Sequence, residues 1–332
     1  MSIKDRLQII LITFNRCEHA RRTLEEVLSP DSPVHDFDIT VLDNNSVDGT
    51  DAMVAELSAS HPNLHYRKNP YNLGIGGNIF RAMEIATGEY LWTICDDDIY
   101  DWSAWPDVEH AVEFGEKVIC AANYIMPAEH RNGVEWPLYQ MTFLPSLVIS
   151  RSLFKDATMR NAFDNAFTLF PHLAPVVTHV NAGGGIYVTP KGVVTAGDRA
   201  ADTSYIRGNR AEDIFVRSRC MSFMVGYANI LANIRDRRLA RRCMDVLING
   251  NHKHRLGYFH FYSAVFLYFK GRQFAPHIVD LKCVLPPHRR LVVSAVRALQ
   301  NSPLNRVFNN RFLYSAIKGI QNRLKAKRAA PR

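Results

Sequence analysis

The sequence predicts an α/β fold built on a mostly parallel sheet. Short apolar runs that have the length of strands alternate with helical patterns along the first half of the chain, at residues 7–12, 38–42, 64–67 and 90–95. This alternation is typical of strand–helix–strand units, whose right-handed crossovers produce parallel strands. The first run is almost continuously apolar, as expected of a strand that is covered by helices on both faces of the sheet.

Length and composition agree with a globular protein. The chain has 332 residues, of which 47% are hydrophobic, so it can bury a large core. No apolar run is long enough to cross a bilayer, and the first residues lack the pattern of a signal peptide, so we expect a cytoplasmic protein. The six cysteines are scattered without a CxxC pair, which favours neither a zinc site nor a disulfide framework.

The most informative stretch is residues 90–98, where an apolar run ends in three consecutive carboxylates, Asp96, Asp97 and Asp98. Neighbouring like charges repel and lose hydration beside a core, so the arrangement persists most easily with a cation between them. Oxygen ligands favour Mg²⁺ or Mn²⁺, either of which could hold a substrate diphosphate. The alternative is a solvated acidic turn that caps a helix beginning near Ser103.

Polar residues also follow the other predicted strands. Thr13, Asp43 and the three acids all fall at carboxyl ends of strands, which is the edge where parallel α/β sheets bind ligands. Asp43 can accept a hydrogen bond from a base or a ribose, and the glycines of residues 74–77 permit close approach of a ligand. Arg81 can face an anion there. Taken singly, these residues could instead be an ordinary polar turn and a surface charge.

The ordered set of motifs at residues 12–16, 41–50, 72–74 with Arg81, and 94–99 resembles the nucleotide-sugar-binding half of family 2 glycosyltransferases of the GT-A fold. The resemblance covers roughly residues 7–120. It implies that the three acids form a DxD motif in which Asp96 and Asp98 hold Mn²⁺ or Mg²⁺. It also implies a set of residues that bind the nucleotide sugar: Thr13, Asn15, Arg16, Asp43, Asn45, Asn72, Gly74, Arg81, Asp96 and Asp97.

The second half departs from the family pattern at the catalytic base. The resemblance implies an acid in the acceptor region, yet residues 166–173 contain none. Three candidates remain open: His172, Asp164 a few residues earlier, and Asp213, which belongs to a Glu-Asp pair that opens a predicted helix. For His172 the alternative is a packed, hydrogen-bonded histidine of the core. For Asp213 it is an acid favoured at a helix start for electrostatic reasons.

The domain organisation follows from these patterns. We expect a GT-A catalytic domain at residues 1–212, with a nucleotide-sugar half at 1–120 and an acceptor half at 121–212. A helical, basic extension at 213–332 should pack on it. Residues 186–189 and 193–195 predict a small hairpin, and residues 198–210 a mobile loop over the donor. Histidines at 252, 254 and 260 are predicted to belong to an aromatic helix and not to a metal site.

The function predicted from these features is inverting, metal-dependent transfer of a sugar from a nucleotide-diphosphate donor, UDP- or dTDP-linked, to a glycan or lipid-linked glycan in surface polysaccharide biosynthesis. Basic residues between 306 and 328 accompany an apolar stripe, which favours peripheral attachment to an anionic membrane at its inner face over a subunit contact or intramolecular packing. Nucleic acid is not expected as a partner, and an oligomer is possible. The alternatives are a nucleotidyltransferase and a non-catalytic module that binds nucleotide sugars or polyanions.

Overall fold

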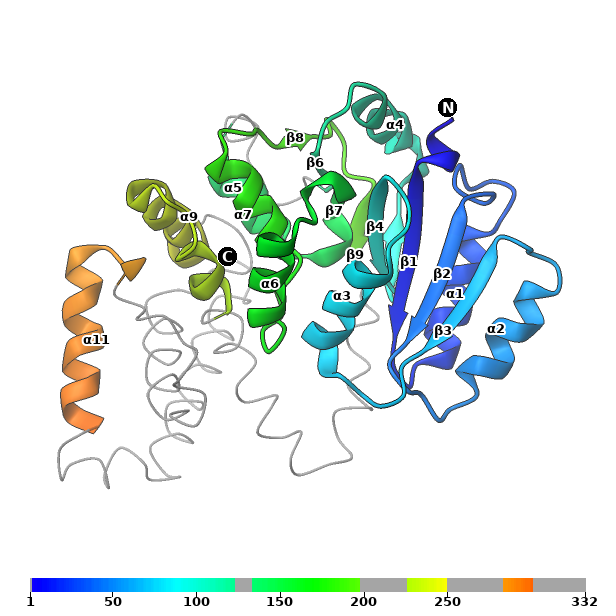
Figure 1. Cartoon of the computed structure of the whole chain (residues 1–332), viewed down its shortest axis with the longest axis horizontal. Helices are drawn as coiled ribbons and strands as arrows, with labels where there is room; N and C mark the ends of the chain where they lie inside the picture. The colour runs from blue at the N-terminus through cyan, green and yellow to red at the C-terminus, as the bar shows by residue number, and fades with distance from the viewer. Residues whose placement is uncertain (1, 123–132, 198–225, 250–282, 301–332) are drawn as a thin grey trace, which may run out of the picture.

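The computed structural model describes residues 2–122, 133–197, 226–249 and 283–300 (Figure 1). A sheet of seven strands runs through the described residues in the order β3-β2-β1-β4-β7-β6-β8. Its strands are β1 (Leu7–Thr13), β2 (Asp38–Asp43), β3 (Leu64–Lys68), β4 (Tyr90–Cys95), β6 (Val118–Cys120), β7 (Leu147–Ser150) and β8 (Tyr187–Val188).

The first half of the sheet is parallel, as predicted. Strand β1 pairs in parallel with β2 on one side and with β4 on the other, and β2 pairs in parallel with β3. Strand β7 runs antiparallel between β4 and β6, and β8 returns to a parallel pairing with β6. The predicted mostly parallel α/β sheet is therefore confirmed, and the carboxyl ends of β1, β2 and β4 lie next to one another.

Helices cover both faces of this sheet, which explains why β1 is buried along its whole length. Alternate residues of β1 contribute to two separate cores, with Ile10 and Ile12 in one and Ile9 and Leu11 in the other. The first core also takes apolar side chains from α3 (Gly74–Ile85), α5 (Glu135–Gln140), α6 (Asp156–Asp164), α7 (Leu173–Asn181) and α9 (Arg237–Asn249). The second takes them from α1 (Cys17–Val27), α2 (Thr50–Ser58) and α4 (Trp105–Glu113).

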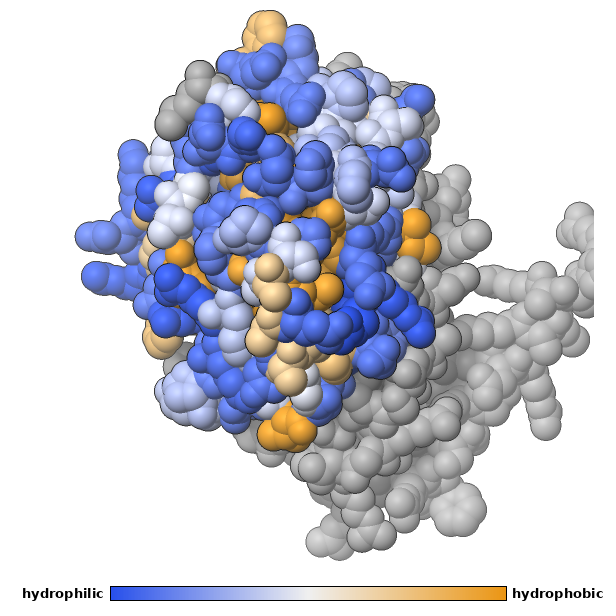
Figure 2. All heavy atoms as spheres, turned by 90° about the vertical axis from the view of Figure 1, so that its right-hand side faces the viewer, coloured by the Kyte–Doolittle hydropathy of each residue, from blue (hydrophilic) through white to orange (hydrophobic). Residues whose placement is uncertain are grey.

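Strand β3 forms one edge of the sheet and is protected by polar side chains. His65, Arg67 and Lys68 are exposed along it. Figure 2, which views the molecule from the β3 side of Figure 1, shows a mostly hydrophilic surface with separate apolar patches. Charged side chains on an edge strand discourage pairing with another chain, so this edge of the sheet ends at β3.

The prediction that residues 186–189 and 193–195 pair as a hairpin is wrong. Strand β8 pairs with β6, whereas β9 (Val194–Ala196) pairs antiparallel with β5 (Asp98–Tyr100) in a separate two-stranded sheet. The intervening backbone is held on β6, because Thr189 N donates to Cys120 O and Val193 N donates to Ala121 O. Strand β9 therefore lies beside β5, which begins at Asp98 shortly after the end of β4.

Part of the predicted extension lies inside the described residues. Residues 226–249 contribute buried side chains to the first core, and α11 (Pro287–Gln300) is a helix. The predicted boundary at 212, the predicted loop at 198–210, the three histidines and the basic residues from 306 lie outside the described residues. Among the helices described, none is both long and apolar enough to cross a membrane.

Candidate active site

Three adjacent strands bring the predicted polar residues to one edge of the sheet. The register of β1 and β2 places Thr13 opposite Asp43, and the register of β1 and β4 places Ile12 opposite Cys95, so Asp96 follows beside Thr13. The backbone N–H of Asn44 donates to Thr13 O at 3.0 Å. Residues far apart in the sequence therefore form one continuous polar surface at the carboxyl ends of the strands.

Asp96 and Asp97 share a cation that belongs to the protein itself. Arg16 Nη1 donates to Asp96 Oδ1 at 2.7 Å and to Asp97 Oδ2 at 3.0 Å. The other oxygen of Asp96, Oδ2, accepts from Thr13 Oγ1 at 2.7 Å. A guanidinium therefore lies between these two acids, and the expected metal ion stays a prediction. The sequence analysis placed Arg16 among the residues that bind the nucleotide sugar and did not pair it with the acids.

Burial excludes the alternative of a solvated acidic turn. Asp96 is 4% exposed and Asp98 is 1% exposed. Asp98 begins β5, and its Oδ2 accepts from Cys95 N at 3.1 Å. The short helix before α4 is capped instead by Asp101, whose side chain accepts from the backbone and the hydroxyl of Ser103.

Loss of hydration is the main electrostatic influence on these two acids. Burial raises the pKa of Asp96 to about 7, although Arg16 and Thr13 act in the opposite direction. Burial, followed by the charge of Asp97, raises the pKa of Asp98 to about 8. Burial therefore makes both carboxylates costly to ionise, and the guanidinium of Arg16 offsets only part of that cost at Asp96.

Asp43 lies fully buried at the end of β2 with both oxygens engaged. Its Oδ2 accepts from the hydroxyl of Tyr66 at 2.6 Å, and its Oδ1 accepts from the backbone N–H and the hydroxyl of Ser46. Tyr66 was missed by the sequence reasoning, although it lies on a strand expected to neighbour β2. Tyr66 and Ser46 fix the orientation of the Asp43 carboxylate, which is predicted to accept a hydrogen bond from the nucleobase.

The loops after β1 and β2 are joined by hydrogen bonds between them. Asn15 N donates to Ser46 Oγ at 2.8 Å, and Asn15 Oδ1 accepts from Val47 N at 2.9 Å. Asn15 and Asn45 both adopt positive φ, of 50° and 71°, a conformation that asparagine tolerates better than most residues. Part of the polar capacity of Asn15 is therefore used to hold the site together.

A group of asparagines positions the loop before α3. Asn44 Nδ2 donates to Asn72 Oδ1 at 2.7 Å, and Asn72 Oδ1 also accepts from Gly74 N at 2.8 Å. Asn69 Nδ2 donates to both Asn44 Oδ1 and Asn78 Oδ1. Asn72 and Gly74, two of the predicted binding residues, are thus linked to the end of β2.

Arg81 has a local partner. It lies on α3 and forms an ion pair with Glu84, one helical turn further along, with 42% of its side chain exposed. The ion pair with Glu84 directs the guanidinium of Arg81 along its own helix. Its predicted approach to a diphosphate stays a prediction.

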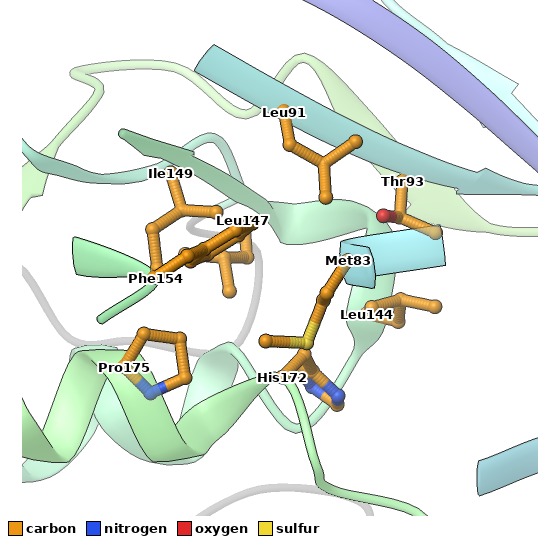
Figure 3. A pocket seen from close by; sticks show the side chains of 9 residues that line it. All are labelled: Met83, Leu91, Thr93, Leu144, Leu147, Ile149, Phe154, His172 and Pro175. Carbon is orange, nitrogen blue, oxygen red and sulfur yellow. The ribbon is translucent and has the colours of Figure 1, made fainter. Parts of the chain in front are cut away.

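The candidate bases differ in accessibility. His172 is 3% exposed, its Nε2–H donates to Met141 O at 2.9 Å, and burial lowers its pKa to about 4. Figure 3 shows His172 at a small cavity lined mostly by apolar side chains, among them Met83 and Leu144. Asp164 ends α6 and is exposed. Asp213 lies outside the described residues.

Taken together, the parallel sheet and the polar surface at its strand ends define a class of α/β proteins that bind ligands at this edge. The family model of glycosyl transferase family 2 matches residues 8–176, which is half of the chain and contains every part of the site described above. The chain belongs to glycosyl transferase family 2.

Curated relatives match the chain over shorter stretches. An abequosyltransferase, RfbV, of Salmonella typhimurium is 32% identical over 88 residues, 26% of each chain. A GalNAc(5)-diNAcBac-PP-undecaprenol β-1,3-glucosyltransferase of Campylobacter jejuni is 31% identical over 94 residues, 28% of this chain and 30% of its own length. The chain therefore spans less than a third of the length of these two relatives.

Solved structures share the architecture over most of the chain. TarS 1–349 of S. aureus has a TM-score of 0.54 at 15% identity, covering 88% of this chain and 87% of that one. The mannosyltransferase PcManGT of Pyrobaculum calidifontis has a TM-score of 0.53 at 14% identity, covering 96% of this chain and 86% of that one. These similarities show that the fold is the GT-A fold of glycosyltransferases.

Proposed function

We propose that this protein is an inverting, metal-dependent glycosyltransferase that transfers one sugar from a nucleotide-diphosphate donor to a hydroxyl of a glycan or lipid-linked glycan. The observation that carries the proposal is the buried acidic turn after β4, which adjoins Thr13 and Asp43 at the ligand-binding edge of the sheet. Membership of family 2 supports the reaction class.

The chemistry of the acidic turn fits a divalent cation. Asp96 and Asp98 offer hard oxygen donors, and both are buried where an ionised carboxylate requires a partner. The described residues contain no group of three or more His, Cys, Asp or Glu side chains that could hold a metal ion by themselves. We therefore propose that Asp96 and Asp98 hold Mn²⁺ or Mg²⁺ together with oxygens of the donor. The structure of PcManGT is a complex with GDP-Man and Mn²⁺, which supports the type of ligand.

A bound cation would supply positive charge for the departing diphosphate. The residues of this chain would bind and orient the donor. In this proposal the loops that carry Asn15 and Asn45 line the site of the nucleobase. The carboxylate of Asp43, held by Tyr66, accepts a hydrogen bond from the nucleobase. Hydrogen bonds that are already in place before binding reduce the ordering needed when the donor arrives.

Of the described candidates, we propose Asp164 as the base that removes the acceptor proton. It is exposed, whereas His172 is buried with its Nε2–H used by Met141 O. Asp164 lies just before residues 166–168, whose backbone approaches Gly76 at the start of α3, and α3 follows the loop at the ligand-binding edge. Inversion would follow from direct attack by the acceptor hydroxyl while Asp164 takes its proton.

The acceptor class is proposed from the relatives. The Campylobacter jejuni relative carries an undecaprenol-linked substrate in its name, and the Salmonella typhimurium relative is named for abequosyl transfer. A lipid-linked acceptor in surface polysaccharide biosynthesis would suit an enzyme located in the cytoplasm or at the inner face of the membrane, and we propose this setting.

The test is a thermal-shift screen of UDP, dTDP and GDP sugars with Mn²⁺, followed by a transfer assay with the donor that stabilises the protein most. We expect Asp98→Asn to lose both the Mn²⁺-dependent shift and transfer. We expect Asp164→Asn to lose turnover while it keeps donor affinity, because a base acts after binding. Wild-type transfer and wild-type metal dependence in Asp98→Asn would show that the site is misassigned.

A further inference from the structure

Arg16 occupies the oxygens that a metal ion would need. One of its nitrogens, Nη1, lies 2.7 Å from Asp96 Oδ1 and 3.0 Å from Asp97 Oδ2, and its side chain is only 14% exposed. The second oxygen of Asp96 is taken by Thr13 Oγ1. Without a ligand, therefore, the charge of Asp96 and Asp97 is balanced from inside the protein.

Binding of a guanidinium and a divalent cation to the same two carboxylates is electrostatically unfavourable. Two positive charges within a few ångströms repel, and the low dielectric of a buried turn strengthens the repulsion. The oxygen of Asp96 that faces Arg16 also cannot give the same lone pair to a metal and to Nη1. A metal that enters alone would have to displace Arg16 and leave a largely buried guanidinium without its carboxylates, which is unfavourable.

A nucleotide diphosphate removes this obstacle because it brings anionic oxygens of its own. When Arg16 moves from the carboxylates to the diphosphate, the guanidinium keeps a charged acceptor, and Asp96 becomes available to the metal. Arginine suits this exchange, since its planar group of donors binds carboxylates and phosphates in the same way.

We propose that Arg16 is a resident counter-ion that makes metal binding depend on the nucleotide diphosphate. This inference rests on the proposed function, since it concerns the same acidic turn. In this scheme Arg16 neutralises Asp96 and Asp97 before ligands bind, excludes a free divalent cation, and binds the diphosphate when the donor and the metal arrive together.

The experiment measures Mn²⁺ binding to the full chain by the EPR signal of free Mn²⁺, with and without UDP or GDP. Three proteins are compared: wild type, Arg16→Met, and Arg21→Met. Arg21 is the matched control because it lies on α1 and pairs with a carboxylate, that of Glu56 at 2.7 Å, on the exposed surface.

Without nucleotide, we expect Arg16→Met to bind Mn²⁺ roughly tenfold more tightly than wild type, and Arg21→Met to match wild type. With nucleotide, we expect the affinity of wild type to rise and the difference from Arg16→Met to shrink. Equal Mn²⁺ affinities of wild type and Arg16→Met without nucleotide, with nucleotide binding intact, would overturn the inference and leave the proposed function standing. If no nucleotide promotes Mn²⁺ binding in any of the proteins, the proposed function itself fails.

The inference remains testable if Arg16→Met does not fold. Arg16→Gln keeps a hydrogen-bond donor but removes the charge, and we expect it to show the same gain in Mn²⁺ affinity. If both variants are unfolded, Mn²⁺ alone should restore their circular dichroism, because the metal then replaces the missing cation. Failure of Mn²⁺ to restore either variant would count against the role of Arg16.

Discussion

At the scale of single residues, the acidic turn is controlled by hydration. Arg16 and Thr13 both stabilise the ionised form of Asp96, yet burial outweighs them and the pKa rises to about 7. Burial is also the main influence on Asp98: together with the charge of the neighbouring Asp97 it raises the pKa of Asp98 to about 8, although the backbone N–H of Cys95 acts in the opposite direction. The structure therefore places two carboxyl groups that titrate near neutral pH at the candidate metal site.

The pH dependence of stability follows from these shifts. Asp96 and Asp98 have higher pKa values in the folded chain, about 7 and about 8, than the ordinary value of 3.8 that they have when unfolded. Between these values the folded chain holds more protons than the unfolded chain, so the stabilisation that the two protonated groups provide is lost as the pH rises towards about 8. His172 acts in the opposite direction below its ordinary value of 6.5, since burial lowers its pKa to about 4. We therefore expect the free energy of unfolding, measured in EDTA by urea denaturation, to fall between about pH 6.5 and 8.5.

The control for this prediction is the double variant Asp96→Asn with Asp98→Asn. It should show a flatter pH profile over the same interval, because its amides do not titrate. A wild-type profile that rises with pH over this interval would contradict the environment assigned to the two acids. Mn²⁺ with a bound nucleotide should reverse the slope, since a metal binds the ionised carboxylates and releases protons.

At the scale of elements, the start of α3 is packed against the backbone of residues 166–168. A Cβ atom at Gly76 would overlap the carbonyl oxygens of Ala166 and Thr168. The small residue thus allows α3, which follows the Asn72 loop, to approach the segment beyond Asp164. The proposed donor side and the proposed acceptor side of the site meet at this contact.

We expect Gly76→Ala to destabilise the protein by about 1–3 kcal/mol, because carbonyl oxygens of the backbone cannot yield as a flexible side chain can. The loss should appear even though alanine is favoured over glycine inside a helix by about 1 kcal/mol. Chemical denaturation measures the change. Gly185→Ala is the control, since nothing lies within 4 Å of a Cβ there. Unchanged stability of Gly76→Ala would show that α3 and residues 166–168 are not in close contact.

At the scale of the whole molecule, residues 226–249 belong to the same core as the first half of the sheet. Tyr227, Ile230 and Leu231 are fully buried in the cluster that also contains Ile10 and Ile12 of β1. An ion pair joins Arg242 of α9 to Glu135 of α5. This part of the predicted extension therefore packs as an integral layer on the sheet.

We expect Leu231→Ala to lower the free energy of unfolding by about 2–5 kcal/mol in one cooperative transition, because a large buried side chain is lost from a shared core. Leu291→Ala is the matched control, since Leu291 is 73% exposed and its truncation should change stability by no more than about 0.5 kcal/mol. Denaturation followed by both fluorescence and circular dichroism checks the outcome. Two separate transitions, with only one affected, would show that residues 226–249 fold independently.

The sequence by itself determined the strands of the first half, the parallel sheet and the place of the acidic turn. Strand residues buried on both faces must be apolar, so β1 and β4 are visible as continuous runs, and polar residues that end such runs must collect at one edge. The family motifs depend on the same local signals. These motifs can be recognised in the sequence without knowledge of which distant residues are in contact.

Only the tertiary structure decided which partners the site residues have. Arg16 reaches Asp96 across 80 residues of sequence, and Tyr66 reaches Asp43 from the neighbouring strand. The pairing of β9 with β5 and the burial of His172 depend on how separate segments pack. Residue type and spacing report local periodicity, whereas contacts between distant residues are set by register and crossover geometry. For that reason the sequence could locate the acids but could not identify the guanidinium that neutralises them.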